Sequence, residues 1–246
     1  MGAADLPPPP SLPALLAQGP LALFLDFDGT LVELAATPGA IAVPAGLGER
    51  LAGLSRRLDG RLALVSGRPI ADLERHCGPL AVDCAGSHGA ERRRADGSAL
   101  GPPPAALPQD LLDRVSRFAE VNAVAYERKP HGAALHSRAV PEMEERCALF
   151  MADLARAHGL AVKRGKRVAE LVRPGADKGH AVRAFVAAPP FAGSRPAFVG
   201  DDATDEDGFA ACSELGGFGV AVGPRPTKSA RYGLADPAAV QQWLGL

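Results

Sequence analysis

The stretch "LFLDFDGTL" at residues 23–31 is an apolar run that ends in two carboxylates, Asp26 and Asp28. The run "LALFL" at 21–25 holds no polar residue, which is typical of a strand covered on both faces. Residues two apart in a strand share a face, so the two carboxylates can point into the same space. Buried charge is costly unless something compensates it. The stretch therefore predicts a strand that ends in a chemical site.

Strands and helices alternate on both sides of this stretch. We expect strands within 61–69 and 80–91, and helices over 46–58 and 70–77. After residue 176 the alternation resumes with a helix over 176–188, strands within 196–209 and 217–223, and a helix within 236–246. Alternating β and α elements predict an α/β fold with a central parallel sheet.

The Gly- and Pro-rich segment 95–108 interrupts the alternation. Beyond it the expected order is a helix, two strands within 123–138, a helix over 141–159 and a hairpin over 160–174. We therefore expect a small α+β unit at 104–176, inserted into a core formed by 19–103 and 177–246. Residues 1–18, with prolines at 7–10, are expected to be a mobile lead-in.

Composition narrows the function without identifying it. The chain has 246 residues, 47% of them hydrophobic, and a formal net charge of -1, so its bulk charge does not suggest nucleic acid. Residues 1–10 show no signal-peptide pattern, and no apolar stretch approaches the ~20 residues of a membrane helix. The four cysteines form no C-x-x-C pair. We expect a cytoplasmic protein with reduced thiols and no membrane partner, and a monomer is compatible with the sequence.

Three expected strands end in polar residues: Asp26 and Asp28 in the first, "SGR" at 66–68 in the second, and "GDD" at 200–202 in a later one. Ligands of open parallel sheets bind at the carboxyl ends of the strands. Clustered carboxylate oxygens suit Mg²⁺, which bridges readily to phosphate. Lys178 stands at an expected helix start, where an ammonium and the helix N-terminus both favour an anion. The pattern predicts a magnesium site that binds a phosphoryl group.

The segments "DFDGTL", "SGR", "DKG" and "GDDATDED" resemble, in order, the four motifs of the haloacid-dehalogenase (HAD) superfamily, whose core is Rossmann-like. The resemblance implies that Asp26 is the nucleophile and forms an aspartyl-phosphate, and that Asp28 is the general acid and base. Mg²⁺ would be held by Asp26, the Asp28 backbone carbonyl and Asp201, with Asp205 nearby through water. Ser66 and Lys178 would hold the phosphoryl oxygens.

Three further segments, "GSHGAE", "YERKPHGAALHSR" and "AELVRPGADKG", extend the likeness. With the core motifs they resemble the trehalose-6-phosphate phosphatase family over residues 25–209. The resemblance implies a small-molecule sugar phosphate as substrate, and an inserted cap that closes over the cleft and sets specificity. Glu127, Lys129 and Glu170 would bind the glucose unit remote from the phosphate. Arg68 and His88 would line the cleft near the phosphate.

Several alternatives stay open at this stage. The core motifs also fit a phosphatase for sucrose phosphate or mannosylglycerate phosphate, and a phosphomutase. A non-catalytic phosphate-binding module is less favoured, because phosphate binding alone does not need Asp28. A calcium loop at 203–214 would place Ala203 where the first acidic ligand belongs. Glu127 and Lys129 could form an exposed ion pair with each other, and His88 could serve only to shape a turn.

Overall fold

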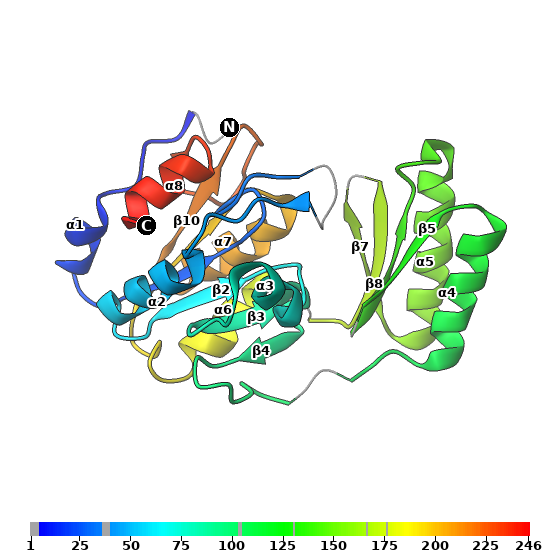
Figure 1. Cartoon of the computed structure of the whole chain (residues 1–246), viewed down its shortest axis with the longest axis horizontal. Coiled ribbons are helices and arrows are strands. Elements are labelled where there is room, and N and C mark those ends of the chain that lie inside the picture. Colours follow the sequence, from blue (N-terminus) through cyan, green and yellow to red (C-terminus); the bar gives the residue numbers. More distant parts are fainter. Residues whose placement is uncertain (1–4, 36–39, 103–104, 130, 166, 176) are drawn as a thin grey trace. The chain divides into compact units, whose positions relative to one another are not determined.

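The computed structural model of the protein describes residues 5–35, 40–102, 105–129, 131–165, 167–175 and 177–246. It divides into two compact units, one of Met1–Pro103 with Asp177–Leu246 and the other of Pro104–Ala176. Figure 1 shows the elements of both units. We refer to them as the core unit and the cap unit.

The core unit is built on a seven-stranded sheet in the order β11-β10-β9-β1-β2-β3-β4. All neighbouring strands run parallel except β3 and β4. The α/β fold with a central, mostly parallel sheet that the alternation predicts is thus confirmed. The strands are β1 (Leu21–Leu25), β2 (Leu62–Val65), β3 (Asp83–Gly86), β4 (Glu91–Arg93), β9 (Arg195–Gly200), β10 (Phe218–Val222) and β11 (Tyr232–Leu234).

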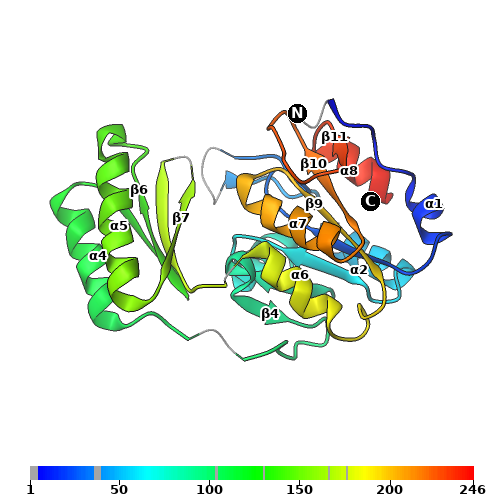
Figure 2. The same cartoon turned by 180° about the vertical axis from the view of Figure 1, so that it is seen from behind.

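Helices cover both faces of this sheet, as Figures 1 and 2 show. Because successive strand residues point to opposite faces, β1 contributes side chains to two separate hydrophobic cores. Leu23 and Leu25 belong to one core, whereas Phe24 belongs to the other. The first core includes residues of α1 (Leu12–Leu16), α2 (Leu47–Arg57), α3 (Ile70–Cys77) and α8 (Pro237–Leu244). The second includes residues of α6 (Lys178–Val186) and α7 (Glu206–Glu214).

The N-terminal segment differs from the mobile lead-in that its prolines predict. Leu12 and Leu15 of α1 are 1% and 2% exposed and belong to the core. Ser11 caps this helix by accepting a hydrogen bond from the Ala14 N–H. The Pro10 carbonyl accepts a hydrogen bond of 2.8 Å from Trp243 Nε1. Burial of two leucines and attachment to α8 tie the segment to the core, and composition alone gave no sign of either.

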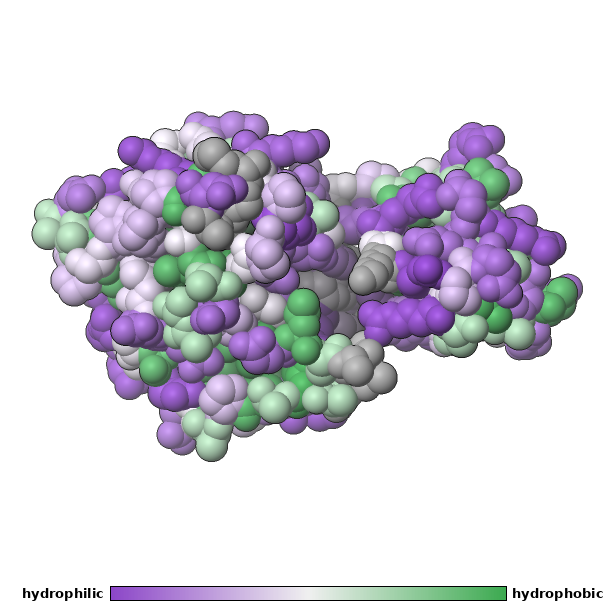
Figure 3. Space-filling model, turned by 90° about the horizontal axis from the view of Figure 1, so that it is seen from above, coloured by the Kyte–Doolittle hydropathy of each residue, from purple (hydrophilic) through white to green (hydrophobic). Residues whose placement is uncertain are grey.

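The cap unit is a four-stranded antiparallel sheet in the order β5-β6-β8-β7. The helix, hairpin, helix, hairpin order expected from the sequence is confirmed. Its elements are α4 (Gln109–Val121), β5 (Ala125–Lys129), β6 (Gly132–His136), the 3₁₀ helix η4 (Pro141–Met143), α5 (Glu144–His158), β7 (Ala161–Gly165) and β8 (Val168–Val172). Figure 3, in which the cap unit lies at the right, shows hydrophilic side chains over most of its visible face, with hydrophobic ones in small groups.

The two faces of the cap sheet differ in character. Residues such as Leu135 and Leu171 pack in one hydrophobic core with residues of α4 and α5. Alternation then turns Glu127, Lys129 and Glu170 to the other face, which we call the charged face. An antiparallel sheet of this kind packs one face on its core and leaves the other polar.

Two further features bear on the class of protein. Among the described residues, no helix combines the length and the hydrophobicity needed to cross a membrane. The cysteines are unpaired, and Cys84, Cys147 and Cys212 are buried. Burial raises the pKa of the Cys84 thiol to about 12, which makes it a poor nucleophile.

Candidate active site

Three neighbouring strands bring their carboxyl ends together in the core unit. β1 lies between β9 and β2, with Leu25 opposite Val199 on one side and Leu64 on the other. The residues that follow these strands are Asp26 after β1, Ser66 after β2 and Asp201 after β9. The Asp26 N–H donates to the Val199 carbonyl at 2.9 Å, so the chain is still paired where the first carboxylate begins. The convergence expected from a parallel sheet is confirmed.

Three carboxylates gather at this edge. Asp26, Asp201 and Asp205 each offer an oxygen, and these atoms lie within 4.8 Å of one another. Asp205 ends the 3₁₀ helix η5 (Ala203–Asp205) and is fully buried. Its Oδ2 accepts a hydrogen bond of 2.8 Å from the Asp202 N–H, half of a capping box that fixes its side chain. The sequence places Asp205 at the margin of the site, whereas the structure places its carboxylate in the same group as the other two.

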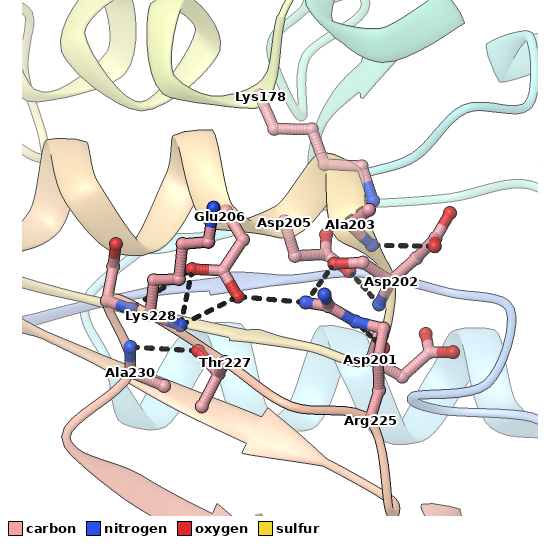
Figure 4. Close-up of polar contacts among 11 residues, drawn as sticks. Lys178, Asp201, Asp202, Ala203, Asp205, Glu206, Arg225, Thr227, Lys228 and Ala230 are labelled. Carbon is pink, nitrogen blue, oxygen red and sulfur yellow. Dashed lines mark hydrogen bonds and ion pairs between the residues drawn. The ribbon is translucent and has the colours of Figure 1, made fainter. Parts of the chain in front are cut away.

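Lys178 is the cation that faces this group. Its Nζ lies 2.8 Å from Asp26 Oδ1 and 2.6 Å from Asp205 Oδ1, and its side chain is 2% exposed. Figure 4 shows Lys178 extending toward Asp205. Asp177 starts α6 by accepting the His180 N–H at 2.7 Å, which sets Lys178 at the first helical position. Burial lowers the pKa of Lys178, but the attraction of Asp205 and Asp26 outweighs it and raises the pKa.

The carboxylates are under electrostatic strain without a further cation. Burial raises the pKa of Asp26 well above its usual range, and repulsion from Asp205 and Asp201 adds to it, while Lys178 opposes both. Burial, and then Asp205, raise the pKa of Asp201 to about 6. One ammonium cannot balance three carboxylates, so the group favours a second cation.

The carboxylate of Asp201 packs closely against the backbone at Gly29 and the side chain of Thr30. Gly29 has a φ of +77°, and a Cβ there would come 2.2 Å from Asp201 Oδ2. Thr30 Oγ1 donates to Asp201 Oδ1 at 3.2 Å. A donor set made only of oxygen atoms suits a hard divalent cation. The residues present therefore fit the metal that the sequence predicts.

Asp28 is held by Arg68 rather than by the carboxylate group. Arg68 Nε and Nη2 donate to the two oxygens of Asp28 at 2.6 and 2.7 Å, and Nη1 donates to Asp72 Oδ2 at 2.7 Å. Burial lowers the pKa of Arg68, but the hydrogen bonds to Asp28 and Asp72 raise it, so this cation stays charged. The two-pronged pairing fixes the Asp28 carboxylate in plane and position. The family resemblance implies that Arg68 lines the cleft near the phosphate, and in the structure its guanidinium binds the carboxylates of Asp28 and Asp72.

Ser66 and His88 share one turn region. The Ser66 hydroxyl accepts the Arg68 N–H at 3.1 Å, and the Ser66 carbonyl accepts the His88 N–H at 2.9 Å. His88 lies in the 3₁₀ helix η3 (Ser87–Gly89) with a φ of +59°. A Cβ on Gly67 would come 2.8 Å from His88 Cε1, so this turn needs glycine at 67. The structure thus brings His88 beside Ser66, and its backbone conformation also shapes the turn.

In the cap unit the charged residues of the sheet form two pairs. Lys129 Nζ lies 2.7 Å from Glu170 Oε2, and His136 Nε2 lies 2.8 Å from Glu127 Oε2. Glu127 and Lys129 therefore do not pair with each other, and each has a different partner on the charged face. His136 was absent from the sequence candidates, although the two-residue period from Gly132 through Ala134 places it on this face. The hydrogen bond from His136 lowers the pKa of Glu127, while burial opposes it.

The sheet register explains these pairings. Glu127, Ala134, Glu170 and Lys163 stand side by side in one row across β5, β6, β8 and β7. Ala134 and Gly132 on the central strand β6 are small, so long side chains from β5 and β8 can meet above them. The charged face therefore carries the carboxylates of Glu127 and Glu170 together with the ammonium of Lys129. Groups of this kind can accept and donate hydrogen bonds to hydroxyl-rich molecules.

Comparison with solved structures places this architecture in a class. A phosphatase of the haloalkanoate (HAD) enzyme superfamily from Bacteroides thetaiotaomicron superposes with a TM-score of 0.62 over 92% of this chain and 93% of its own, at 16% identity. At this identity the likeness concerns the fold alone. The fold of this chain is therefore the fold of the HAD phosphatases.

The particular family follows from closer similarities. The family model for trehalose-phosphatase matches residues 24–238. The trehalose-6-phosphate phosphatase of Escherichia coli is 36% identical over 226 residues, which cover 91% of this chain and 85% of that protein. The C-terminal domain of the C. albicans trehalose-6-phosphate phosphatase superposes with a TM-score of 0.77 at 26% identity, over 98% and 97% of the two chains. The chain belongs to the trehalose-phosphatase family.

Proposed function

We propose that this protein hydrolyses trehalose 6-phosphate to trehalose and inorganic phosphate through an aspartyl-phosphate on Asp26. The observation that carries the proposal is the buried contact between Asp26 and Lys178 at the edge of three parallel strands. A nucleophilic carboxylate needs a neighbouring cation, because the phosphoryl oxygens it approaches are negatively charged. Membership of the trehalose-phosphatase family supports the choice of substrate.

In the first step Asp26 attacks the phosphorus atom. The new bond joins an Asp26 oxygen to phosphorus, while the bond from phosphorus to the sugar O6 breaks. Asp28, which enters this step as the carboxylic acid, gives its proton to the departing O6, which leaves as the trehalose hydroxyl. In the second step Asp28 takes a proton from water, which attacks the aspartyl-phosphate and restores the Asp26 carboxylate. Atoms and protons balance over the two steps.

Arg68 fixes the orientation of Asp28. Because the guanidinium binds both Asp28 oxygens, it aims the carboxyl group and limits its motion. We therefore propose that Arg68 orients Asp28 rather than binding phosphate directly. Ser66 and Lys178 would donate hydrogen bonds to the phosphoryl oxygens, and His88 would line the same edge beside Ser66.

We propose Mg²⁺ as the cofactor, held by Asp26, Asp201 and the Asp28 backbone carbonyl, with Asp205 acting through water. When bound, Mg²⁺ neutralises charge on the phosphoryl group as a Lewis acid. Asp205 accepts hydrogen bonds on both oxygens, from Lys178 and from the Asp202 N–H, which suits an indirect role. The raised pKa values of Asp26 and Asp201 support the need for a cation at this position.

We assign substrate choice to the charged face of the cap sheet. Glu127, Lys129 and Glu170 are proposed to bind the hydroxyls of the glucose unit remote from the phosphate. The pairs with His136 and with Lys129 hold the two glutamates ready as hydrogen-bond acceptors. Pre-formed acceptors lose little freedom when a sugar binds.

The test of this function is phosphate release from trehalose 6-phosphate, sucrose 6-phosphate and glucose 6-phosphate, each with and without Mg²⁺. We expect a strong preference for trehalose 6-phosphate and loss of turnover with EDTA. Preference for another sugar would keep the chemistry and overturn the cap assignment. No turnover on any ester would favour a phosphate-binding module over an enzyme.

Glu127→Ala is expected to lower kcat/KM for trehalose 6-phosphate by about 10- to 100-fold, chiefly through KM. The reason is the loss of a charged hydrogen-bond acceptor to the remote sugar. Turnover of p-nitrophenyl phosphate, which has no second sugar, should change by less than about threefold. Glu145→Ala on α5 is the matched control, because Glu145 is an exposed cap glutamate paired with Arg164. Equal losses on both esters would contradict a sugar contact.

The gain in melting temperature on adding Mg²⁺ is expected to be larger at pH 7 than at pH 5. Burial raises the pKa of Asp201 to about 6, so between about pH 4 and pH 6 the folded chain keeps a proton that the unfolded chain has lost. Stability of the metal-free protein therefore falls as the pH rises through this window. Above it the Asp201 carboxylate is ionised and can bind the cation. Melting curves with and without Mg²⁺ measure the difference, and an equal gain at both pH values would contradict the assignment.

A further inference from the structure

Arg225 holds the backbone of the acidic strand end from a separate loop. This loop follows β10 and leads into β11. Arg225 Nε donates to the Asp201 carbonyl at 3.0 Å, and its Nη2 donates to the Asp202 carbonyl at 2.9 Å. Figure 4 shows the guanidinium among these residues. Two successive peptide groups at the end of β9 are thus fixed by one side chain.

Glu206 fixes Arg225 in turn. Glu206 Oε1 accepts a hydrogen bond of 2.9 Å from Arg225 Nη2, and its carboxylate also accepts the N–H groups of Lys228 and Ser229, the latter at 3.0 Å. Burial raises the pKa of Glu206, but hydrogen bonds from Thr227, Arg225 and Lys228 lower it overall. The first turn of α7 is therefore tied to the 223–231 loop through an ionised carboxylate.

We infer that Arg225 is a positioning residue for the divalent cation, because it fixes the Asp201–Asp202 backbone that presents the Asp201 carboxylate. The inference rests on the proposed function, since it concerns the metal of that site. Groups that orient a ligand residue are part of a metal site as much as the ligands are. Arg225 is paired with Glu206, so the pair carries no net charge, and its effect on the cation comes from geometry rather than from repulsion.

The charges around Asp201 at the end of β9 also support a positioning role for Arg225. Asp201 already meets repulsion from Asp205 and Asp202. Thr30 contacts one Asp201 oxygen, and Arg225 contacts the Asp201 carbonyl, so side chain and backbone are each restrained. Removing the backbone restraint should therefore weaken cation binding before the substrate is present.

The test compares Arg225→Ala with Arg231→Ala by calorimetric titration of Mg²⁺ into the whole protein without substrate. Both variants lose one arginine from the same loop, but Arg231 is exposed and lies against the Tyr232 ring, 5.4 Å from its centroid. We expect Arg225→Ala to weaken Mg²⁺ binding by about 10- to 100-fold and Arg231→Ala by less than about twofold. At saturating Mg²⁺, KM for trehalose 6-phosphate should stay within about twofold of wild type in both.

Arg225→Lys provides the second variant. A single ammonium can reach one carbonyl but cannot serve both carbonyls and Glu206, so its Mg²⁺ affinity should lie between those of wild type and Arg225→Ala. Circular dichroism and melting curves identify a variant that fails to fold, in which case the lysine variant decides the question.

The outcomes separate the inference from the proposed function. Wild-type affinity in folded Arg225→Ala, or the same loss in Arg231→Ala, overturns the positioning role while leaving the phosphatase proposal in place. A wild-type protein that binds no Mg²⁺ and hydrolyses no trehalose 6-phosphate overturns both. Weaker Mg²⁺ binding in Arg225→Ala alone, with partial recovery in Arg225→Lys, supports the inference.

Discussion

Asp26→Asn is expected to lower phosphate release from trehalose 6-phosphate by about 10⁴-fold or more while the fold stays intact. The amide is a far weaker nucleophile than the carboxylate and cannot form the aspartyl-phosphate. The fold should survive, because burial and the repulsion of Asp205 and Asp201 already raise the pKa of Asp26. Neutralising it relieves that repulsion, and Lys178 keeps Asp205 as a partner at 2.6 Å.

The measurement is a phosphate-release assay beside a melting curve. Asp59→Asn is the matched control, since Asp59 is an exposed aspartate of the core unit with a φ of +50°, which asparagine adopts readily. The control should keep wild-type turnover. Retention of a substantial share of activity in a folded Asp26→Asn protein would overturn the nucleophile assignment and, with it, the aspartyl-phosphate.

The core of the site could be predicted from sequence because its signals are local. Apolar runs end in polar residues at Asp26, Ser66 and Asp201, and a parallel sheet brings such ends to one edge. Lys178 follows a helix-capping aspartate, which also reads directly from the sequence. These features need no knowledge of distant contacts, so their placement in the structure agrees with the expectation.

Features that depend on contacts between distant segments were missed or misplaced. The acidic segment at 201–207 leads directly into α7, whose Gly208 packs so tightly that a Cβ would come 2.6 Å from Phe198 Cδ2. Acidic residues are also favoured in a first helical turn, so charge alone does not separate ligands from helix starts. Asp205 lies beside Asp26 and Asp201 because of a turn and a contact with Lys178. Lys178 is 27 positions away, so this contact cannot be read from the local sequence.

The pairings of the cap unit depend on sheet register. Lys129 on β5 reaches Glu170 on β8 past the small residues of β6, and the two are 41 positions apart. Sequence places Lys129 near Glu127, yet neighbouring charges on a strand choose partners across the sheet. Nothing in the sequence marks Arg225 as a functional residue, because an arginine in a loop is ordinarily a solvated side chain.

Lys178→Met is expected to lower both the stability of the protein and its turnover, and both losses should be large. Lys178 and its two carboxylate partners are buried, and removing one member of a buried ion pair leaves uncompensated charge. We expect the free energy of unfolding of the metal-free protein to fall by about 3 to 5 kcal/mol at neutral pH. Turnover should fall by about 10²- to 10³-fold at saturating Mg²⁺, because a cation facing the phosphoryl group is lost.

The pH dependence of this loss tests its cause. Lys178 lowers the pKa of Asp26, so removal of Lys178 raises that pKa further. A protein that contains a carboxyl group with a higher pKa in the folded state than in the unfolded state becomes less stable as the pH rises. The variant should therefore lose more stability at pH 8 than at pH 5, and Mg²⁺ should restore part of it. Urea unfolding measures both effects, with Lys228→Met as control because Lys228 is exposed on the 223–231 loop. A pH-independent loss would mean that methionine disturbs packing rather than charge balance, and Lys178 would then be a structural residue.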